Sequence, residues 1–223
     1  MKLRRRATLL AATACLLSAC GTAAPDRASA PPPVHPAPVL ASSSATGAPA
    51  GTSTSAGATA VAAAVVRAPA YGLGDSVMLG SKTLLASHRI PVNAVVSRQF
   101  SAAPAIVASW ARAGVVRRNL VIHLGTNGTI AAKDCRSVVT TAGPTRRVFL
   151  LTVHAKRSWT AQANRTIRAC AAAYGTRRVV VLDWDAAARL HPGWLSAYGI
   201  HPNTTGRRYY TSLILTGIAR YGV

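Results

Sequence analysis

The sequence predicts a three-layer α/β/α fold around a parallel sheet of five strands. Beyond about Arg67, short runs of large apolar residues alternate with longer, alanine-rich stretches of helical character. Uninterrupted apolar strands are typical of a sheet covered on both faces, and regular strand–helix alternation is typical of parallel connections. The expected strands are residues 71–73, 91–96, 120–124, 148–153 and 179–182. The expected helices are residues 77–87, 102–113, 130–142, 159–174 and 204–221.

Residues 1–19 have the pattern of an export signal. A basic start is followed by an apolar stretch from Ala7 to about Ala19, which is too short to span a bilayer. The stretch ends in Leu17-Ser18-Ala19-Cys20-Gly21, which resembles the bacterial lipobox. This resemblance implies a lipoprotein signal peptide, with cleavage before Cys20 and a lipid on Cys20. An ordinary secretory signal with an incidental cysteine is the alternative.

Residues 20–66 are predicted to be a disordered linker. They consist mainly of Ala, Pro, Ser, Thr and Gly, and so bury too little apolar surface to offset the entropy of ordering. The linker would tether the folded domain, residues 67–223, to the membrane anchor. Asp26 and His35 lie in this segment and are assigned no catalytic role.

The charge of the chain is strongly positive, with 26 Lys+Arg against 5 Asp+Glu and a formal net charge of +21. Such a charge attracts polyanions. The basic residues are scattered, however, and form no basic helix or aromatic-lined groove, which argues against nucleic acid as the partner. Anionic envelope polymers or lipid headgroups agree better with the export signal. The scarcity of acidic residues also leaves few candidates for a catalytic carboxylate.

Two cysteines remain in the expected domain, Cys135 and Cys170. They lie on two expected helices that should be neighbours on one face of the sheet, and export places them in an oxidising compartment. A disulfide is therefore predicted, with two buried thiols as the alternative. Neither cysteine has a partner at metal-ligand spacing, so no metal is predicted. No cofactor is predicted either, since no phosphate-cradling glycine loop is present.

Ligands of a parallel sheet bind beyond the carboxyl ends of its strands. Ser76 lies between a strand and a helix start, where backbone N–H groups favour a developing oxyanion. A serine nucleophile needs a base, and His201, just before the last helix, is the strongest candidate. The polar residues expected at this edge are Asp75, Ser76, Ser97, Arg98, Thr126, Asn127, His154, Asp183 and Asp185.

Four short motifs, in order, resemble the sequence blocks of the SGNH/GDSL hydrolases. They are Gly74-Asp75-Ser76-Val77-Met78-Leu79-Gly80, Val96-Ser97-Arg98-Gln99, Leu124-Gly125-Thr126-Asn127-Gly128 and Gly199-Ile200-His201-Pro202. The first resembles in particular the SGNH domains attached to membrane acyltransferases that O-acetylate cell-wall polysaccharides. The match runs from about Tyr71 to the C-terminus, and it implies the flavodoxin-like SGNH fold.

The resemblance also implies roles for individual residues. Ser76 would be the nucleophile and His201 its general base. The backbone N–H groups of Ser76 and Ser97, with the side-chain amide of Asn127, would form the oxyanion hole. Asp75 would support the nucleophile loop.

Two positions depart from the family pattern. Ser97 stands where the family has glycine, and Tyr198 stands where it has the aspartate of the triad, three residues before the histidine. Three accounts of the missing acid remain open. Ser76 and His201 could act as a dyad, Asp183 or Asp185 could replace the acid, or the site could be degenerate.

The expected function is that of a serine esterase or O-acyl (acetyl) transferase acting on ester groups of cell-envelope glycans. The protein would be lipid-anchored to a bacterial membrane and would face the periplasm or the cell exterior. A transferase would need a separate membrane acyltransferase partner to supply the acetyl group. The alternative is a catalytically degenerate domain that binds envelope polysaccharide.

Overall fold

The structure, a computed structural model, describes residues 69–223. It contains the predicted parallel sheet of five strands in the order β2-β1-β3-β4-β5. Every neighbouring pair of strands is parallel. In chain order the strands are β1 (Ala70–Gly74), β2 (Val92–Ala94), β3 (Asn119–His123), β4 (Arg147–Leu151) and β5 (Val179–Leu182).

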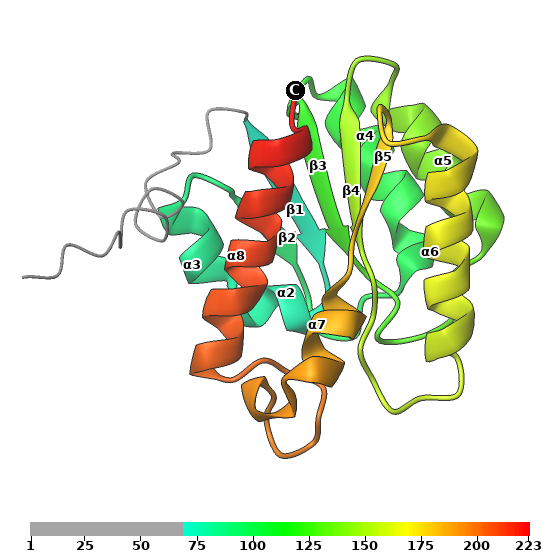
Figure 1. Cartoon of the computed structure of the whole chain (residues 1–223). Helices are drawn as coiled ribbons and strands as arrows, with labels where there is room; N and C mark the ends of the chain where they lie inside the picture. The colour runs from blue at the N-terminus through cyan, green and yellow to red at the C-terminus, as the bar shows by residue number, and fades with distance from the viewer. Residues whose placement is uncertain (1–68) are drawn as a thin grey trace, which may run out of the picture. The chain divides into compact units, whose positions relative to one another are not determined.

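Helices cover both faces of the sheet, which confirms the predicted three layers. Figure 1 shows α4, α5 and α6 on one side of the strands and α3 and α8 on the other. The α-helices are α2 (Ser76–Gly80), α3 (Lys82–Ser87), α4 (Ala103–Arg112), α5 (Ala132–Ala142), α6 (Thr160–Tyr174), α7 (Trp184–Leu190) and α8 (Thr204–Tyr221). Two short 3-10 helices are η1 (Phe100–Ala102) and η2 (Pro192–Trp194).

The apolar core is divided by the sheet into two clusters. Leu120 and Ile122 of β3 pack in the cluster that contains residues of α4, α5 and α6. Val121, the residue between them, packs in the other cluster with residues of α3 and α8. Successive side chains of a strand point to opposite faces, so an uninterrupted apolar strand supplies both clusters at once. This is the physical reason why the apolar runs identified the sheet.

Some expected boundaries were wrong. The helix expected over residues 77–87 is broken at Ser81, which follows Gly80, a poor helix former. The second strand ends at Ala94 instead of Val96, and Val95 and Val96 are exposed. Helix α7 was not predicted, because its seven residues are too few to show a clear helical period.

The strand order brings a reversal next to β1. The chain passes from β1 to β2 on one side of it, and then crosses to β3 on its other side. The connections leaving β1 and β3 therefore diverge to opposite faces and leave a crevice beyond the carboxyl ends of these strands, which is where parallel sheets bind ligands. Ser76 follows β1 and Asn127 follows β3, so the fold places both at this crevice.

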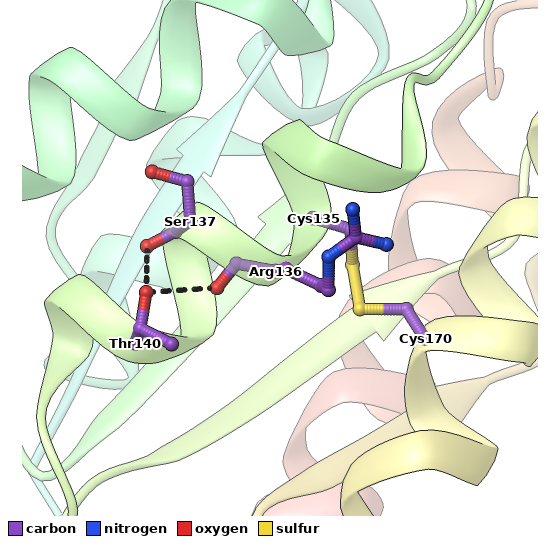
Figure 2. The surroundings of a disulfide bond; sticks show 5 residues. All are labelled: Cys135, Arg136, Ser137, Thr140 and Cys170. Atoms are coloured by element: carbon purple, nitrogen blue, oxygen red, sulfur yellow. Dashed lines mark hydrogen bonds between the residues drawn. A yellow bond between two sulfur atoms is a disulfide. The ribbon is translucent and has the colours of Figure 1, made fainter.

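The predicted pairing of the two cysteines is present in the structure. Cys135 of α5 and Cys170 of α6 form a disulfide, with their Cα atoms 6.4 Å apart (Figure 2). Both residues belong to the core cluster under α4, α5 and α6. One turn further along α5, Thr140 donates its hydroxyl to the carbonyl oxygens of Arg136 and Ser137. The disulfide thus joins two helices that already pack on the same face of the sheet.

Replacing both Cys135 and Cys170 by alanine is expected to lower the free energy of unfolding by about 2–4 kcal/mol. The disulfide joins positions 35 residues apart, and a crosslink of that span restricts the unfolded chain. Urea denaturation of the oxidised protein and the double variant measures the difference. A reducing agent should destabilise the parent alone, and equal unfolding midpoints under oxidising conditions would contradict the prediction.

The predicted signal peptide, the lipidation of Cys20 and the linker over residues 20–66 lie outside the described residues. They stay predictions, as does the start of the domain at residue 67. Within residues 69–223, none of the helices combines the length and the apolar character needed to cross a bilayer.

Candidate active site

Ser76 stands where β1 turns into α2. Asp75 precedes the helix, and its Oδ1 accepts a hydrogen bond from the Val77 N–H at 3.0 Å. Such an N-cap typically stabilises a helix by about 1 kcal/mol. The Asp75 side chain is fully buried, whereas Ser76 is half-buried and lines a pocket. The turn therefore directs the carboxylate inward and leaves the hydroxyl at the crevice.

His201 reaches Ser76 from the other end of the domain sequence. Its Nε2 lies 2.9 Å from the Ser76 Oγ, across 125 residues of chain. The loop that carries it is fixed by a hydrogen bond from the Ser196 N–H to the His201 carbonyl at 2.8 Å. Asn203 then caps α8 by accepting from the Gly206 N–H at 3.0 Å. Gly206 is required there, since a Cβ would lie 2.1 Å from the Trp194 carbonyl oxygen.

Ser97 and Asn127 line the same pocket as Ser76 and His201. Ser97 has a φ of 62°, in the left-handed region that glycine adopts without cost. The departure from glycine noted in the sequence therefore costs strain on the order of 1 kcal/mol. The Asn127 Nδ2 donates to the Arg98 carbonyl at 3.3 Å, which ties the loop after β3 to the loop after β2.

Arg98 holds the loop that carries Ser97. Its guanidinium donates to the carbonyl oxygens of Gly74 at 3.2 Å and Asn93 at 2.7 Å, and to the Asn93 Oδ1 at 2.8 Å. Burial lowers the pKa of Arg98, and the nearby Asp75 carboxylate opposes that effect. One cation therefore crosslinks the ends of β1 and β2, next in sequence to Ser97 of the expected oxyanion hole.

A buried polar pair lies behind the nucleophile turn. The His123 carbonyl accepts from the Asp75 N–H at 3.2 Å, and the His123 Nδ1 lies 2.9 Å from the Tyr210 hydroxyl. Burial lowers the pKa of His123 and raises that of Tyr210 well above its usual value. His123 thus packs inside the core of the sheet, where burial disfavours its protonated form.

Within residues 69–223, neither Asp183 nor Asp185 forms a hydrogen bond or ion pair with His201. Asp183 accepts from the Thr152 hydroxyl and the Arg168 guanidinium, both at 2.7 Å. Burial would raise the pKa of Asp183, but these hydrogen bonds outweigh it and hold the pKa below its usual value.

Asp185 is committed elsewhere as well. Its Oδ1 lies 2.9 Å from the His154 Nδ1, and its Oδ2 lies 3.0 Å from a nitrogen of Arg189. Asn164 donates to the same Oδ2 at 3.3 Å. The contacts of the two carboxylates therefore give no support to a substitute acid.

Replacing Asp183 by asparagine is expected to lower the free energy of unfolding by about 0.5–1 kcal/mol at neutral pH. The change removes the charge paired with Arg168 at the start of α7. Because the pKa of Asp183 is lowered in the folded state, its contribution is present above the unfolded pKa of about 3.9 and is lost as pH falls through the folded value. Urea denaturation at pH 7 and pH 3 should show the difference shrinking at the lower pH.

Asp134→Asn is the matched control for this prediction, since Asp134 also stands at a helix start, in the first turn of α5, but has no ion pair within residues 69–223. An Asp183→Asn difference that stays constant with pH would contradict the prediction. Asp183→Asn should also keep kcat/KM for an ester within twofold, because the Asp183 carboxylate of the parent does not contact His201.

Tyr198, at the position of the expected triad acid, is 85% exposed. Among the hydrogen bonds of residues 69–223, the His201 side chain makes a single one, to Ser76. Within the described part of the chain, the geometry is that of a serine–histidine dyad. No group of three or more metal-ligating side chains is present there either.

The pocket is completed by residues that the sequence motifs did not assign to the site. Gln99 extends the second motif, Ile200 precedes the histidine, and Arg157 and Trp159 come from the segment between β4 and α6. The last two lie in a connection without a motif, where the sequence offers no signal. The complete lining is Ser76, Ser97, Gln99, Thr126, Asn127, Arg157, Trp159, Ile200 and His201.

No family model matches the chain. It is 25% identical over 145 residues to the putative peptidoglycan O-acetyltransferase YrhL of Bacillus subtilis, covering 64% of this chain and 22% of that protein. It is 28% identical over 150 residues to the O-acetyltransferase OatA of Staphylococcus aureus, covering 64% of this chain and 24% of that protein. The chain therefore spans about a quarter of the length of these curated relatives.

Among solved structures, the chain is similar to the C-terminal catalytic domain of peptidoglycan O-acetyltransferase A (OatA) from Streptococcus pneumoniae, which carries a methylsulfonyl adduct. The TM-score is 0.62 at 21% sequence identity, and the match covers 69% of this chain and 94% of that domain. At this level of identity the likeness establishes a shared fold. The fold that the sequence motifs implied is thus the fold of a known catalytic domain.

Proposed function

We propose that the domain is a serine esterase or O-acetyltransferase that acts on ester groups of cell-envelope glycans. The observation that carries this proposal is the 2.9 Å contact between the Ser76 Oγ and the His201 Nε2, at the sheet edge where ligands bind. Nucleophile and base within hydrogen-bonding distance are the arrangement that covalent catalysis by serine requires. The relatives described as O-acetyltransferases support acetyl as the group transferred.

In the proposed mechanism the Ser76 Oγ attacks the ester carbonyl carbon while the His201 Nε2 takes the hydroxyl proton. The resulting oxyanion is stabilised by the backbone N–H groups of Ser76 and Ser97 and by the Asn127 amide. Donors of this kind are typically worth a few kcal/mol each in the transition state. The tetrahedral intermediate collapses, and the alcohol leaves with the proton held by His201.

The second half of the reaction decides between hydrolysis and transfer. Water attacking the acetyl-Ser76 ester gives acetate, and a sugar hydroxyl gives an acetylated glycan. In both cases His201 takes the proton of the attacking group and returns it to the Ser76 Oγ. The proposed acid-free dyad lowers the rate, because an unassisted imidazolium is less well stabilised.

The proposal places this reaction outside the cytoplasmic membrane. The export pattern of residues 1–19 supports that location, and Cys20 would carry the lipid that holds the domain at the membrane. If the enzyme transfers acetyl groups, a membrane acyltransferase would supply them.

Covalent trapping tests this function directly. The full chain is incubated with methanesulfonyl fluoride, and the peptide that contains Ser76 is examined by mass spectrometry, with Ser76→Ala as the control. One adduct on Ser76, with parallel loss of activity toward para-nitrophenyl acetate, is the expected result. Acceleration of ester consumption by soluble glycan, with acetyl groups appearing on the glycan, would assign transfer. Labelling at another residue, or none, would count against the mechanism.

A glycan-binding domain without turnover is the second candidate. The observation that favours it is the exposed Tyr198 in place of a triad acid. Binding of cell-wall glycan by the full chain, without trapping at Ser76 and without hydrolysis of either activated or acetylated glycan esters, is the result that would select it.

A further inference from the structure

The pocket around Ser76 contains one side chain with a fixed charge, Arg157. Arg157 lies between β4 and α6, where its backbone N–H donates to the Ala155 carbonyl at 3.0 Å and its carbonyl accepts from the Thr160 N–H at 3.1 Å. Its side chain is exposed, and within residues 69–223 it makes no hydrogen bond or ion pair. The backbone is thus held while the guanidinium stays available to a ligand.

No carboxylate is among the residues that line this pocket. Asp75 is buried and caps α2, and Asp134 is on α5 and does not line the pocket. Asp183 and Asp185 are paired with other side chains. A pocket of one charge sign focuses its field on an approaching ligand, so the crevice attracts an anion.

Two further groups of the pocket lack hydrogen-bond partners in the described part of the chain. Thr126 is 7% exposed, and its hydroxyl is buried and unpaired. The indole N–H of Trp159, two residues after Arg157, is also buried and unpaired. An indole can only donate, and a buried polar group without a partner is costly unless a ligand or water satisfies it. Both groups are enclosed in the wall of the pocket, so the exposed Arg157 guanidinium is the group available to the oxygens of an anionic ligand.

We propose that Arg157 makes this site selective for acetyl esters that carry an anionic group, such as a carboxylate, close to the ester. The inference rests on the proposed ester chemistry and names the class of substrate. A guanidinium matches the paired oxygens of a carboxylate by two parallel hydrogen bonds. Because Arg157 is exposed and lines the same pocket as Ser76, it can contact the part of the substrate next to the acetyl group while Ser76 attacks the carbonyl.

Two matched substrates test the proposal, meta-acetoxybenzoate and meta-acetoxybenzamide, which differ in one negative charge. The full chain is assayed for kcat/KM with each, after correction for the hydroxide-catalysed rate of each ester. We expect the benzoate to be preferred about fivefold, which is the size of an exposed ion pair. Arg157→Gln should abolish the preference, and Arg157→Lys should retain part of it.

Lys156→Gln is the matched control, because it removes the same charge from the adjacent residue, which does not line the pocket. It should leave the preference within twofold, and the preference of the parent should shrink at high salt. Hydrolysis of both esters without preference, or an equal preference in Arg157→Gln, overturns the assignment while the ester chemistry stands. Absence of hydrolysis of either ester, together with no trapping at Ser76, overturns the proposed function and this inference with it.

Discussion

Replacing Ser76 by alanine is expected to lower kcat/KM for an activated acetyl ester by about a hundredfold. The reason for this size is the missing acid. In serine hydrolases, removing the complete triad costs about a million-fold, and the acid alone accounts for more than ten-thousandfold of it. A dyad of Ser76 and His201 therefore starts from a lower rate, and less remains to be lost. The measurement is the steady-state hydrolysis of para-nitrophenyl acetate by the full chain.

The same argument predicts the behaviour of the histidine. His201→Gln should lose about as much as Ser76→Ala, and the double variant should lose no more than either one. Non-additivity of this kind is expected because the hydroxyl is a poor nucleophile without its base and the base has no function without the hydroxyl. Ser76→Ala that retains the parent rate would contradict the assignment. A loss near a million-fold would instead indicate that a carboxylate assists His201 and would contradict the acid-free dyad.

The fold could be predicted because its signal is local and repeated. Each strand is a short, uninterrupted apolar run, and its residues are buried on both faces of the sheet, as Val121 and Ile122 show. The break at Ser81 and the short helix α7 were missed for the opposite reason, since neither carries a period long enough to read. Asp183, which caps α7 by accepting from the Ala186 N–H, is a local signal of that helix.

The core of the site could be predicted from motifs, and its surroundings could not. The structure brings Ser76 and His201 into contact, as the ordered motifs led us to expect. The partners of Asp183 and Asp185 depend on how α6 packs against β5. Arg168, which binds Asp183, lies on α6, 15 residues before it in the sequence. Arg157 likewise enters the pocket from an irregular connection. Such long-range placements follow from packing, which no local pattern encodes.

Replacing Tyr198 by aspartate is expected to raise kcat/KM for the same ester, by about ten- to a hundredfold. Position 198 is three residues before His201, where the SGNH pattern has the acid that orients the base. A carboxylate there would accept a hydrogen bond from the His201 Nδ1–H and so orient the ring. It would also stabilise the imidazolium that forms when Ser76 gives up its proton. The full ten-thousandfold value of a triad acid is not expected, because the surrounding loop has not been shaped around a carboxylate.

The structure indicates that Tyr198→Asp should have little effect on stability. Tyr198 is 85% exposed, so its ring contributes little packing, and the free energy of unfolding should change by less than about 0.5 kcal/mol. Tyr198→Asn is the control, since asparagine has nearly the same shape as aspartate but carries no charge. A rate gain in Asp but not in Asn, together with retained trapping at Ser76, would show that the site is an intact dyad limited by its missing acid. Equal rates in Tyr198→Asp, Tyr198→Asn and the parent would show that a side chain at position 198 does not reach the His201 ring. In that case the turn from Ser196 to Gly199, closed by a 2.8 Å hydrogen bond, directs the side chain of residue 198 away from the pocket.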